Sequence, residues 1–284
     1  MSYRILAEGA LEKMGCTPDG DGPVGYVLKV GQQRIDGNAL LGRQLRLEFL
    51  GRILCRNCGR VTRKSFNQGH CFPCFRKLAS CDNCIVSPEK CHHHLGSCRE
   101  PAWGESFCMQ PHLVYLSNSS GLKVGITRQT QAPTRWLDQG AESALPLYRT
   151  RTRYLAGLVE VAAKAHVADR TNWRAMLKGS PDPVELERER ERVRELLNSD
   201  ITALTQEHGH DAIVDLDDAP ASWSYPVERW PEKVSSHNLD KNPVLEGRLE
   251  GIKGQYLIFD CGVINIRKYT AYEVALAESV VEAG

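Results

Sequence analysis

The residues with the clearest chemistry in this 284-residue chain are cysteines, because nine of its eleven lie between Cys55 and Cys108. Cys55-Arg-Asn-Cys58 and Cys71-Phe-Pro-Cys74 form two Cys-x-x-Cys pairs separated by twelve residues. Pairs of thiolates on tight turns can surround a tetrahedral zinc ion at about 2.3 Å from each sulfur. Sulfur would fill all four coordination positions, so the spacing predicts a structural zinc site and not a catalytic one.

A second group of ligand-type residues follows the first. It contains five thiols and four imidazoles, which exceed the needs of one ion: Cys81, Cys84, Cys91, Cys98, Cys108, His92, His93, His94 and His112. A second zinc ion is therefore expected, with Cys81 and Cys84 as the first choice of ligands because they form another Cys-x-x-Cys pair. The sequence leaves the other two ligands open. At least two histidines of the triplet are expected in an exposed polar turn, and the isolated Cys16 and Cys261 as small core residues.

The first cysteine group is strongly basic. Residues 52–77 contain seven Lys or Arg and no Asp or Glu, and Phe66, Phe72 and Phe75 lie between them. Cations can neutralise phosphates while aromatic rings stack on bases, which is how single strands and RNA are commonly held. The expected nucleic-acid contacts are Arg56, Arg60, Arg63, Lys64, Arg76 and Lys77. The alternative is a solvated charged surface.

Composition sets broad limits on the class of protein. Hydrophobic residues make up 42% and charged residues 25%, with a formal net charge of +1, which is typical of a globular protein of about two domains. No apolar run approaches the ~20 residues of a membrane-spanning helix, and the N-terminus lacks a signal-peptide pattern. Since the cysteines come without a secretion signal, metal binding in the cytoplasm is expected instead of disulfides, with no membrane partner.

The pattern of elements predicts an α+β protein in four segments. These are an N-terminal β segment (1–51), a two-site zinc-binding module (52–112), an α/β module (113–200), and a loop-rich linker with a C-terminal β segment (201–284). Alternating apolar residues predict strands at 24–30 and 44–50, and hairpins at 113–126 and 256–267. Helical periodicity predicts helices at 134–139, 154–168 and 181–197. The N- and C-terminal strands are expected to pair in a small sheet or barrel.

The segment from about 112 to 175 resembles the GIY-YIG nuclease superfamily. Val114-Tyr-Leu116 and Lys123-Val-Gly-Ile-Thr127 stand where that family has two strands with its namesake triplets, followed by an arginine and by a glutamate on a later helix. Tyr115 and Gly125 match the triplets, Arg135 or else Arg128 matches the arginine, and Glu160 matches the glutamate. Asn172 matches a polar residue beyond it, and Lys123 replaces the second tyrosine. A zinc ribbon before this segment also resembles an uncharacterised prokaryotic family.

The resemblance implies metal-dependent phosphodiester hydrolysis. Glu160 would bind Mg²⁺ or Mn²⁺, Tyr115 would act as the base or orient water, and Arg135 would clamp the phosphate. Simpler interpretations exist, in which Tyr115 is a surface strand residue, Arg135 caps a loop, and Glu160 merely pairs with Lys164 one turn later.

The sequence therefore predicts a zinc-containing nucleic-acid-binding protein with a nuclease-like module. One alternative is a module that binds RNA or DNA without cutting it. Another is an adaptor that binds proteins through its zinc knuckles and the 182–195 helix. The nuclease hypothesis requires Tyr115, Arg135 and Glu160 to converge on one concave surface beside the basic stretch 52–77, and it fails if they point apart.

Overall fold

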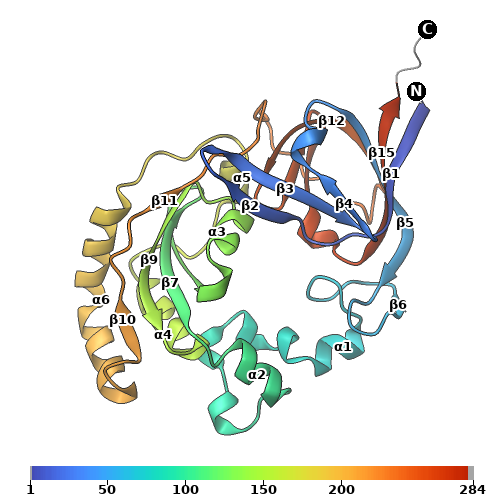
Figure 1. The fold of residues 1–284 in the computed structure, drawn as a ribbon. Coiled ribbons are helices and arrows are strands. Elements are labelled where there is room, and N and C mark those ends of the chain that lie inside the picture. The colour runs from blue at the N-terminus through green and yellow to red at the C-terminus, as the bar shows by residue number, and fades with distance from the viewer. Residues whose placement is uncertain (1, 281–284) are drawn as a thin grey trace. The chain divides into compact units, whose positions relative to one another are not determined.

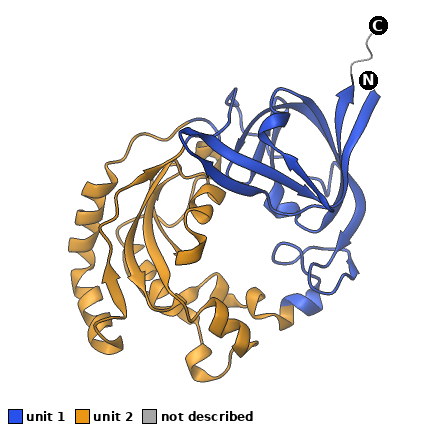
Figure 2. Cartoon of the chain, in the orientation of Figure 1, with its two compact units in different colours: residues 1–75, 177–179, 224–284 blue, residues 76–176, 180–223 orange. Residues whose placement is uncertain are grey.

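The computed structural model describes residues 2–280, and these residues form two compact units (Figure 2). Unit 1 comprises residues 1–75, 177–179 and 224–284, and unit 2 comprises residues 76–176 and 180–223. The boundary at Phe75 and Arg76 divides the cysteine-rich segment that the sequence groups as 52–112. The two cysteine groups therefore belong to different units, and each unit is described by itself.

Unit 1 is built from two antiparallel sheets (Figure 1). The larger has the order β1-β15-β5-β12-β13-β14, with β6 paired to β5, and the smaller has the order β2-β3-β4. The strands of the larger sheet are β1 (Ser2–Ala10), β5 (Gln44–Leu54), β6 (Val61–Thr62), β12 (Val244–Lys253), β13 (Tyr256–Phe259), β14 (Gly262–Asn265) and β15 (Tyr272–Val280). Those of the smaller are β2 (Gly15–Asp19), β3 (Gly22–Val30) and β4 (Gln33–Asp36). Single 3₁₀ turns lie at Asn38–Leu40 and Ile266–Tyr269.

The two ends of the chain meet in the larger sheet. β1 and β15 pair antiparallel from Ser2 opposite Val280 to Ala10 opposite Glu273. Among residues 2–280 this sheet stays open, so the terminal strands form a sheet and not the barrel that was the other expectation. In β5, Leu45 and Leu47 are buried at alternate positions, which is the period-2 pattern of a strand with one face on a core.

Unit 2 contains a mixed α/β layer structure. Its sheet has the order β10-β9-β7-β8, with β11 paired to β9. The strands are β7 (His112–Asn118), β8 (Leu122–Arg128), β9 (Ser143–Thr150), β10 (Ile213–Asp215) and β11 (Ala221–Ser222). The helices are α2 (Pro101–Phe107), α3 (Thr134–Asp138), α4 (Arg153–Ala163), α5 (Trp173–Met176) and α6 (Leu186–His208), and α1 (Phe72–Lys77) contains the unit boundary. Short 3₁₀ turns occupy Ala79–Cys81, Asn83–Ile85, Pro88–Lys90, His93–Leu95 and Gln129–Gln131.

Helices cover both faces of the unit 2 sheet (Figure 1). One face packs Val114, Leu116 and Val124 against apolar residues of α4 and α6. The opposite face packs Leu113 and Tyr115 against Trp136 of α3. Because successive strand residues point to opposite faces, Tyr115 belongs to the α3 side of β7.

Two helices differ from their predicted bounds. The helix expected at 181–197 begins at Leu186, because Pro181 and Pro183 precede it, and it continues to His208. The helix expected at 154–168 begins one residue earlier, with the Thr152 hydroxyl accepting from the Leu155 N–H, and ends at Ala163. The chain after it turns to the edge of β8, where the Val124 N–H donates to the Ala168 carbonyl.

Helices that could span a bilayer are not found in the part of the chain that the structure describes.

Candidate functional site

The first cysteine cluster lies in unit 1, in the ribbon that follows β5. The sulfurs of Cys55, Cys58, Cys71 and Cys74 all lie within 4.8 Å of one another, and those of Cys58 and Cys71 are 3.8 Å apart. The first knuckle is closed by the Gly59 N–H, which donates to the Cys55 carbonyl, and the second by the Phe75 N–H, which donates to the Cys71 carbonyl. This arrangement can hold one tetrahedral zinc ion and fits a zinc ribbon.

Local hydrogen bonds, burial and neighbouring thiols shift the pKa of two of these thiols in opposite directions. Burial alone would raise the pKa of Cys55, but the backbone N–H groups of Cys71, Cys58 and Asn57 lower it to about 6. The Asn57 amide also donates to the Cys74 sulfur at 3.3 Å and lowers its pKa, but burial and the neighbouring thiols raise that pKa to about 12. Cys55 therefore ionises more readily than Cys74, and both bind a metal ion as thiolates.

The predicted nucleic-acid contacts are all solvent-exposed. Arg56, Arg60, Arg63 and Lys64 belong to unit 1, and Arg76 and Lys77 follow the unit boundary. Within unit 1, the Phe66 ring lies 5.4 Å from the Phe72 ring and 5.6 Å from the Phe75 ring, with the Lys64 ammonium 5.4 Å from the Phe66 centroid. Basic and aromatic groups therefore share the surface of this ribbon.

The second cysteine cluster lies in unit 2 and surrounds a small cavity of about 10 Å³. Four thiols line this cavity, from Cys84, Cys91, Cys98 and Cys108. Cys81, which spacing made a first choice of ligand, is buried outside the lining. Burial raises the pKa of both Cys84 and Cys108 to about 11, and the nearby guanidinium of Arg153 opposes that rise in each.

The histidines near this cavity differ from the expected exposed turn. His94 is exposed, but His92 and His93 are half-buried and line the cavity. The ring of His92 contacts the Ser97 hydroxyl at 2.8 Å and lies 3.5 Å from the Asp82 carboxylate. His92, Asp82 and Cys84 form a second group whose ligand atoms lie within 4.8 Å of one another. His112 is fully buried, its Nδ1 contacts the Gln110 carbonyl at 2.7 Å, and burial lowers its pKa to about 4.

The two isolated cysteines also differ from each other. Cys16 is buried, as a small core residue would be. Cys261 is exposed, and its thiol donates to the Glu246 carbonyl at 3.2 Å, so the expectation of a core position was wrong for Cys261.

A buried polar cluster lies on the α3 side of the unit 2 sheet. The Tyr115 hydroxyl donates to Oε1 of Gln139 at 3.2 Å, and the Lys123 ammonium donates to the same oxygen. Gly125, directly opposite Tyr115 on β8, makes room for the ring, since a Cβ there would lie 2.8 Å from the hydroxyl. Tyr115 is therefore not the surface residue of the simpler interpretation, because its side chain is fully buried.

Arg135 and Glu160 lie within electrostatic reach of this pair. Burial raises the pKa of Tyr115, Arg135 lowers it and Glu160 raises it further. Burial lowers the pKa of Lys123 to about 7, with Arg135 acting in the same direction and Glu160 against it. Glu160 also makes the ion pair with Lys164 that its spacing allows, at 3.4 Å, and Lys164 reaches Asp169 at 3.5 Å.

Two other predicted residues lie elsewhere in unit 2. Arg128 is five residues beyond Lys123 along β8, pairs with His112 across the strands, and places its guanidinium 4.1 Å from the Phe107 centroid. Asn172 caps the short α5, with its side-chain oxygen accepting from the Ala175 N–H. Tyr115 and Lys123 thus share an acceptor with Arg135 and Glu160 in electrostatic reach, whereas Arg128 and Asn172 lie elsewhere. The side chains of Tyr115 and Lys123 are buried and do not lie on an open surface.

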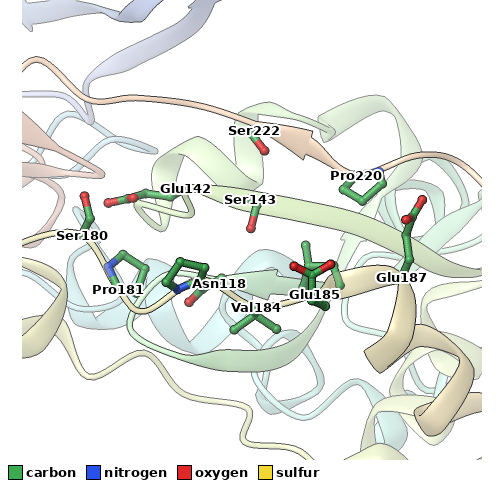
Figure 3. Close-up of a pocket in the computed structure, with 12 residues that line it drawn as sticks. Asn118, Glu142, Ser143, Ser180, Pro181, Val184, Glu185, Glu187, Pro220 and Ser222 are labelled. Carbon is green, nitrogen blue, oxygen red and sulfur yellow. The ribbon is translucent and has the colours of Figure 1, made fainter.

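Gln139 and Asp169 were missed from the sequence, because a single amide after a helix and a single carboxylate in a loop match no motif. A separate cavity of about 430 Å³ was missed for the same reason (Figure 3). It lies between β11, the end of β7 and the chain that enters α6, where Glu142, Glu185 and Glu187 reach its rim. The Asn118 amide closes one side by donating to the Asp182 carbonyl at 2.8 Å.

Comparison with known proteins identifies a family whose description states no activity. Residues 42–274 match the family described as "Protein of unknown function (DUF2797)", and the chain belongs to that family. Neither a curated protein nor a solved structure matches the chain.

Proposed function

We propose that this member of the DUF2797 family is a zinc-containing nucleic-acid-binding protein that hydrolyses phosphodiester bonds with Mg²⁺ or Mn²⁺. The observation that carries the proposal is the shared acceptor of Tyr115 and Lys123, with Arg135 and Glu160 in electrostatic reach of both. The order along the chain also supports it, since two paired strands, an arginine on the next helix and a glutamate on a later helix follow the GIY-YIG pattern.

The residues fit a divalent cation at Glu160. Mg²⁺ keeps several waters and is commonly bound by one or two carboxylates together with substrate phosphate oxygens. Glu160 supplies one carboxylate, and Asp169, which shares the Lys164 ammonium with it, is a candidate second acid. The cation would stabilise the charge that develops on the phosphate.

The protein's own groups divide the remaining tasks. Arg135 is a permanent cation and would clamp the phosphate. Burial raises the pKa of Tyr115, so its hydroxyl is suited to donate a hydrogen bond and to orient the attacking water. Burial lowers the pKa of Lys123 to about 7, so its amine is suited to accept the proton of that water near neutral pH.

Residues 52–77, called the basic ribbon from here on, support the choice of nucleic acid as substrate. Six exposed cations and three aromatic rings lie in a stretch without acidic residues. Such a surface binds phosphates by releasing counterions and binds bases by stacking. The zinc ion would hold a segment that is too short of apolar residues to fold on a core of its own.

One specific observation favours a second candidate, a module that binds nucleic acid without cutting it. The Glu160–Lys164 ion pair already neutralises the carboxylate that the cation needs. The adaptor alternative has less support, since Leu186, Val193 and Leu197 of α6 are buried against the sheet and Arg194 pairs with Asp217 at 2.8 Å.

The test is cleavage of end-labelled single- and double-stranded DNA and RNA by the purified full chain with Mg²⁺, with Mn²⁺ and with a chelator. Glu160→Gln and Arg135→Ala should lower the cleavage rate by about 10²–10³-fold while binding persists. Glu195→Gln and Arg188→Ala, which change exposed residues of α6, are the matched controls. Binding without cleavage by the wild-type protein would replace the nuclease with the non-catalytic module.

A further inference from the structure

We propose that Cys84, Cys91, Cys98 and Cys108 bind a second structural zinc ion within unit 2, that Cys81 is not a ligand, and that Arg153 is the counter-charge of this centre. The inference concerns a different site from the proposed phosphodiesterase cluster and does not depend on it. Sequence spacing left this ligand set open and favoured Cys81.

Four thiols share the lining of one cavity with three other ligand-type residues, Asp82, His92 and His93. All four line one space of about 10 Å³, which is about the volume that one water molecule or one metal ion needs. Cys91 and Cys108 are buried, and Cys84 and Cys98 are half-buried. Within residues 2–280 none of these four sulfurs has a hydrogen-bond partner, whereas Cys81 does have an interaction partner. Among residues 2–280, no three of these four sulfurs lie within 4.8 Å of one another, so the proposed ion would have to draw them together around the cavity that they share.

The other candidate ligands are already engaged. The Asp82 carboxylate receives the Arg99 guanidinium at 2.7 Å. The His92 ring contacts Ser97, and Nε2 of His93 lies 3.4 Å from the Pro101 carbonyl and 3.3 Å from the Glu105 carboxylate. Each of these groups would have to leave a polar partner to bind metal, which the four thiols need not do.

Charge supports the same assignment. Zinc with four thiolates carries a net negative charge, which is costly in a buried site unless a cation lies close by. Arg153 is a largely buried cation within electrostatic reach of Cys84 and Cys108. Its Nη2 donates to the Ile85 carbonyl at 2.7 Å, whereas its Nε is buried without a hydrogen-bond partner, so part of the guanidinium is left for a charge in the cluster.

The centre would also fix the helix that bears Glu160. The Arg153 N–H donates to the Cys108 carbonyl at 2.8 Å, so α4 begins on the backbone of a ligand. One turn later, Gly157 packs so closely on the turn between Cys84 and Cys91 that a Cβ there would lie 2.5 Å from the Glu89 nitrogen. The zinc ion would therefore hold the cysteine loop as a support for α4.

Zinc content of the full chain tests the ligand set. We expect two zinc ions per wild-type chain by elemental analysis and native mass spectrometry. Cys98→Ser and Cys108→Ser should each retain one, and the matched control Cys81→Ser should retain two. Loss of a zinc ion from Cys81→Ser, two ions retained in Cys98→Ser and Cys108→Ser, or a single ion in the wild-type protein would each overturn the proposal.

Two further measurements guard against variants that fail to fold. X-ray absorption of the wild-type zinc protein should show sulfur ligands only, at about 2.3 Å, and a nitrogen contribution from imidazole would overturn the four-thiol assignment. Arg153→Gln should release one of the two zinc ions to a chelator at least several-fold faster than the wild-type protein, and Arg153→Lys should restore part of the retention. An unchanged release rate in Arg153→Gln would rule out its role as the counter-charge.

Discussion

Tyr115 and Lys123, on the paired strands β7 and β8, both donate hydrogen bonds to one oxygen, Oε1 of Gln139. An amide oxygen has two lone pairs, so it can accept hydrogen bonds from both donors. Gln139 is a neutral acceptor and compensates little for the charge of Lys123, and Glu160 offsets only part of the cost of burying that charge. The protonation state of Lys123 should therefore affect the stability of unit 2.

Lys123→Met should stabilise the protein at neutral pH. Burial lowers the folded-state pKa of Lys123 from 10.5 to about 7. Between these values the unfolded chain binds a proton that the folded chain does not, so the folded state is penalised, and the penalty disappears as pH rises to about 10.5. We expect the variant to raise the free energy of unfolding at pH 7 by about 1–4 kcal/mol.

Urea unfolding at pH 7 and pH 9 measures this effect. The gain in the free energy of unfolding should be smaller at pH 9, because much of the cost of burying Lys123 in the wild-type protein has disappeared at that pH. Lys90→Met, at an exposed lysine of the same unit, is the control and should change stability little at either pH. A Lys123→Met variant that is less stable than the wild-type protein at pH 7 would contradict the burial argument.

The cleavage rate should rise with pH through a midpoint near 7. A base must be neutral to accept a proton, and the pKa of Lys123 is about 7. Lys123→Arg cannot lose its charge, so the variant should lose this midpoint and about 10²-fold or more in kcat/KM. Tyr115→Phe should lower the rate but keep the midpoint. Steady-state cleavage rates from pH 5.5 to 9 measure this midpoint. A midpoint that survives in Lys123→Arg excludes Lys123 as the base.

Local patterns were sufficient for the strands and the helix that hold this cluster. Alternation predicted the hairpin of β7 and β8, and a short run after Pro133 predicted α3, because both depend on neighbouring residues. Gln139 could not be predicted, since its role comes from two strands meeting the end of α3. The pairing of N- and C-terminal strands was predicted, but β1 itself was not placed, because its partner β15 lies more than 250 residues away and the strand has no local partner to mark it.

The cysteines show the same limit. The first cluster could be predicted because all its ligands come from two tight turns that spacing fixes. In the second cluster, spacing favoured Cys81 with Cys84, but Cys81, at the end of the 3₁₀ turn Ala79–Cys81, is not among the residues that line the cavity with Cys84. Ligands gathered from four separate turns depend on tertiary packing, which no spacing rule contains.

Gly125→Ala should damage both stability and activity. The added Cβ would lie 2.8 Å from the Tyr115 hydroxyl and 2.9 Å from the ring carbon that bears it, in a fully buried site. Either the ring or the strand must move, at a cost of about 1–3 kcal/mol in the free energy of unfolding. The displaced hydroxyl would also leave Gln139. Gly25→Ala, where the nearest atom would be the Thr17 hydroxyl at 3.4 Å, is the matched control and should change little. Urea unfolding and cleavage assays should agree, and wild-type activity in Gly125→Ala would remove Tyr115 from the site.

The salt dependence of nucleic-acid binding should show whether the cations of the basic ribbon contact phosphates. Arg60→Ala and Lys64→Ala each remove one exposed cation. If each contacts a phosphate, each substitution should reduce the slope of log K against log salt by about 1, somewhat less for a single strand. Lys233→Ala removes an exposed cation from another part of unit 1 and should leave the slope unchanged.

Removal of the first zinc ion tests whether nucleic-acid binding depends on the fold of the ribbon as well as on its cations. Cys58→Ser keeps every cation but removes a zinc ligand, so the ribbon should lose its fold and most of its affinity. Fluorescence anisotropy from 50 to about 300 mM salt gives both slope and affinity. If Arg60→Ala, Lys64→Ala and Lys233→Ala all have the wild-type slope, nucleic acid does not bind the ribbon, and the exposed cations are only a solvated surface.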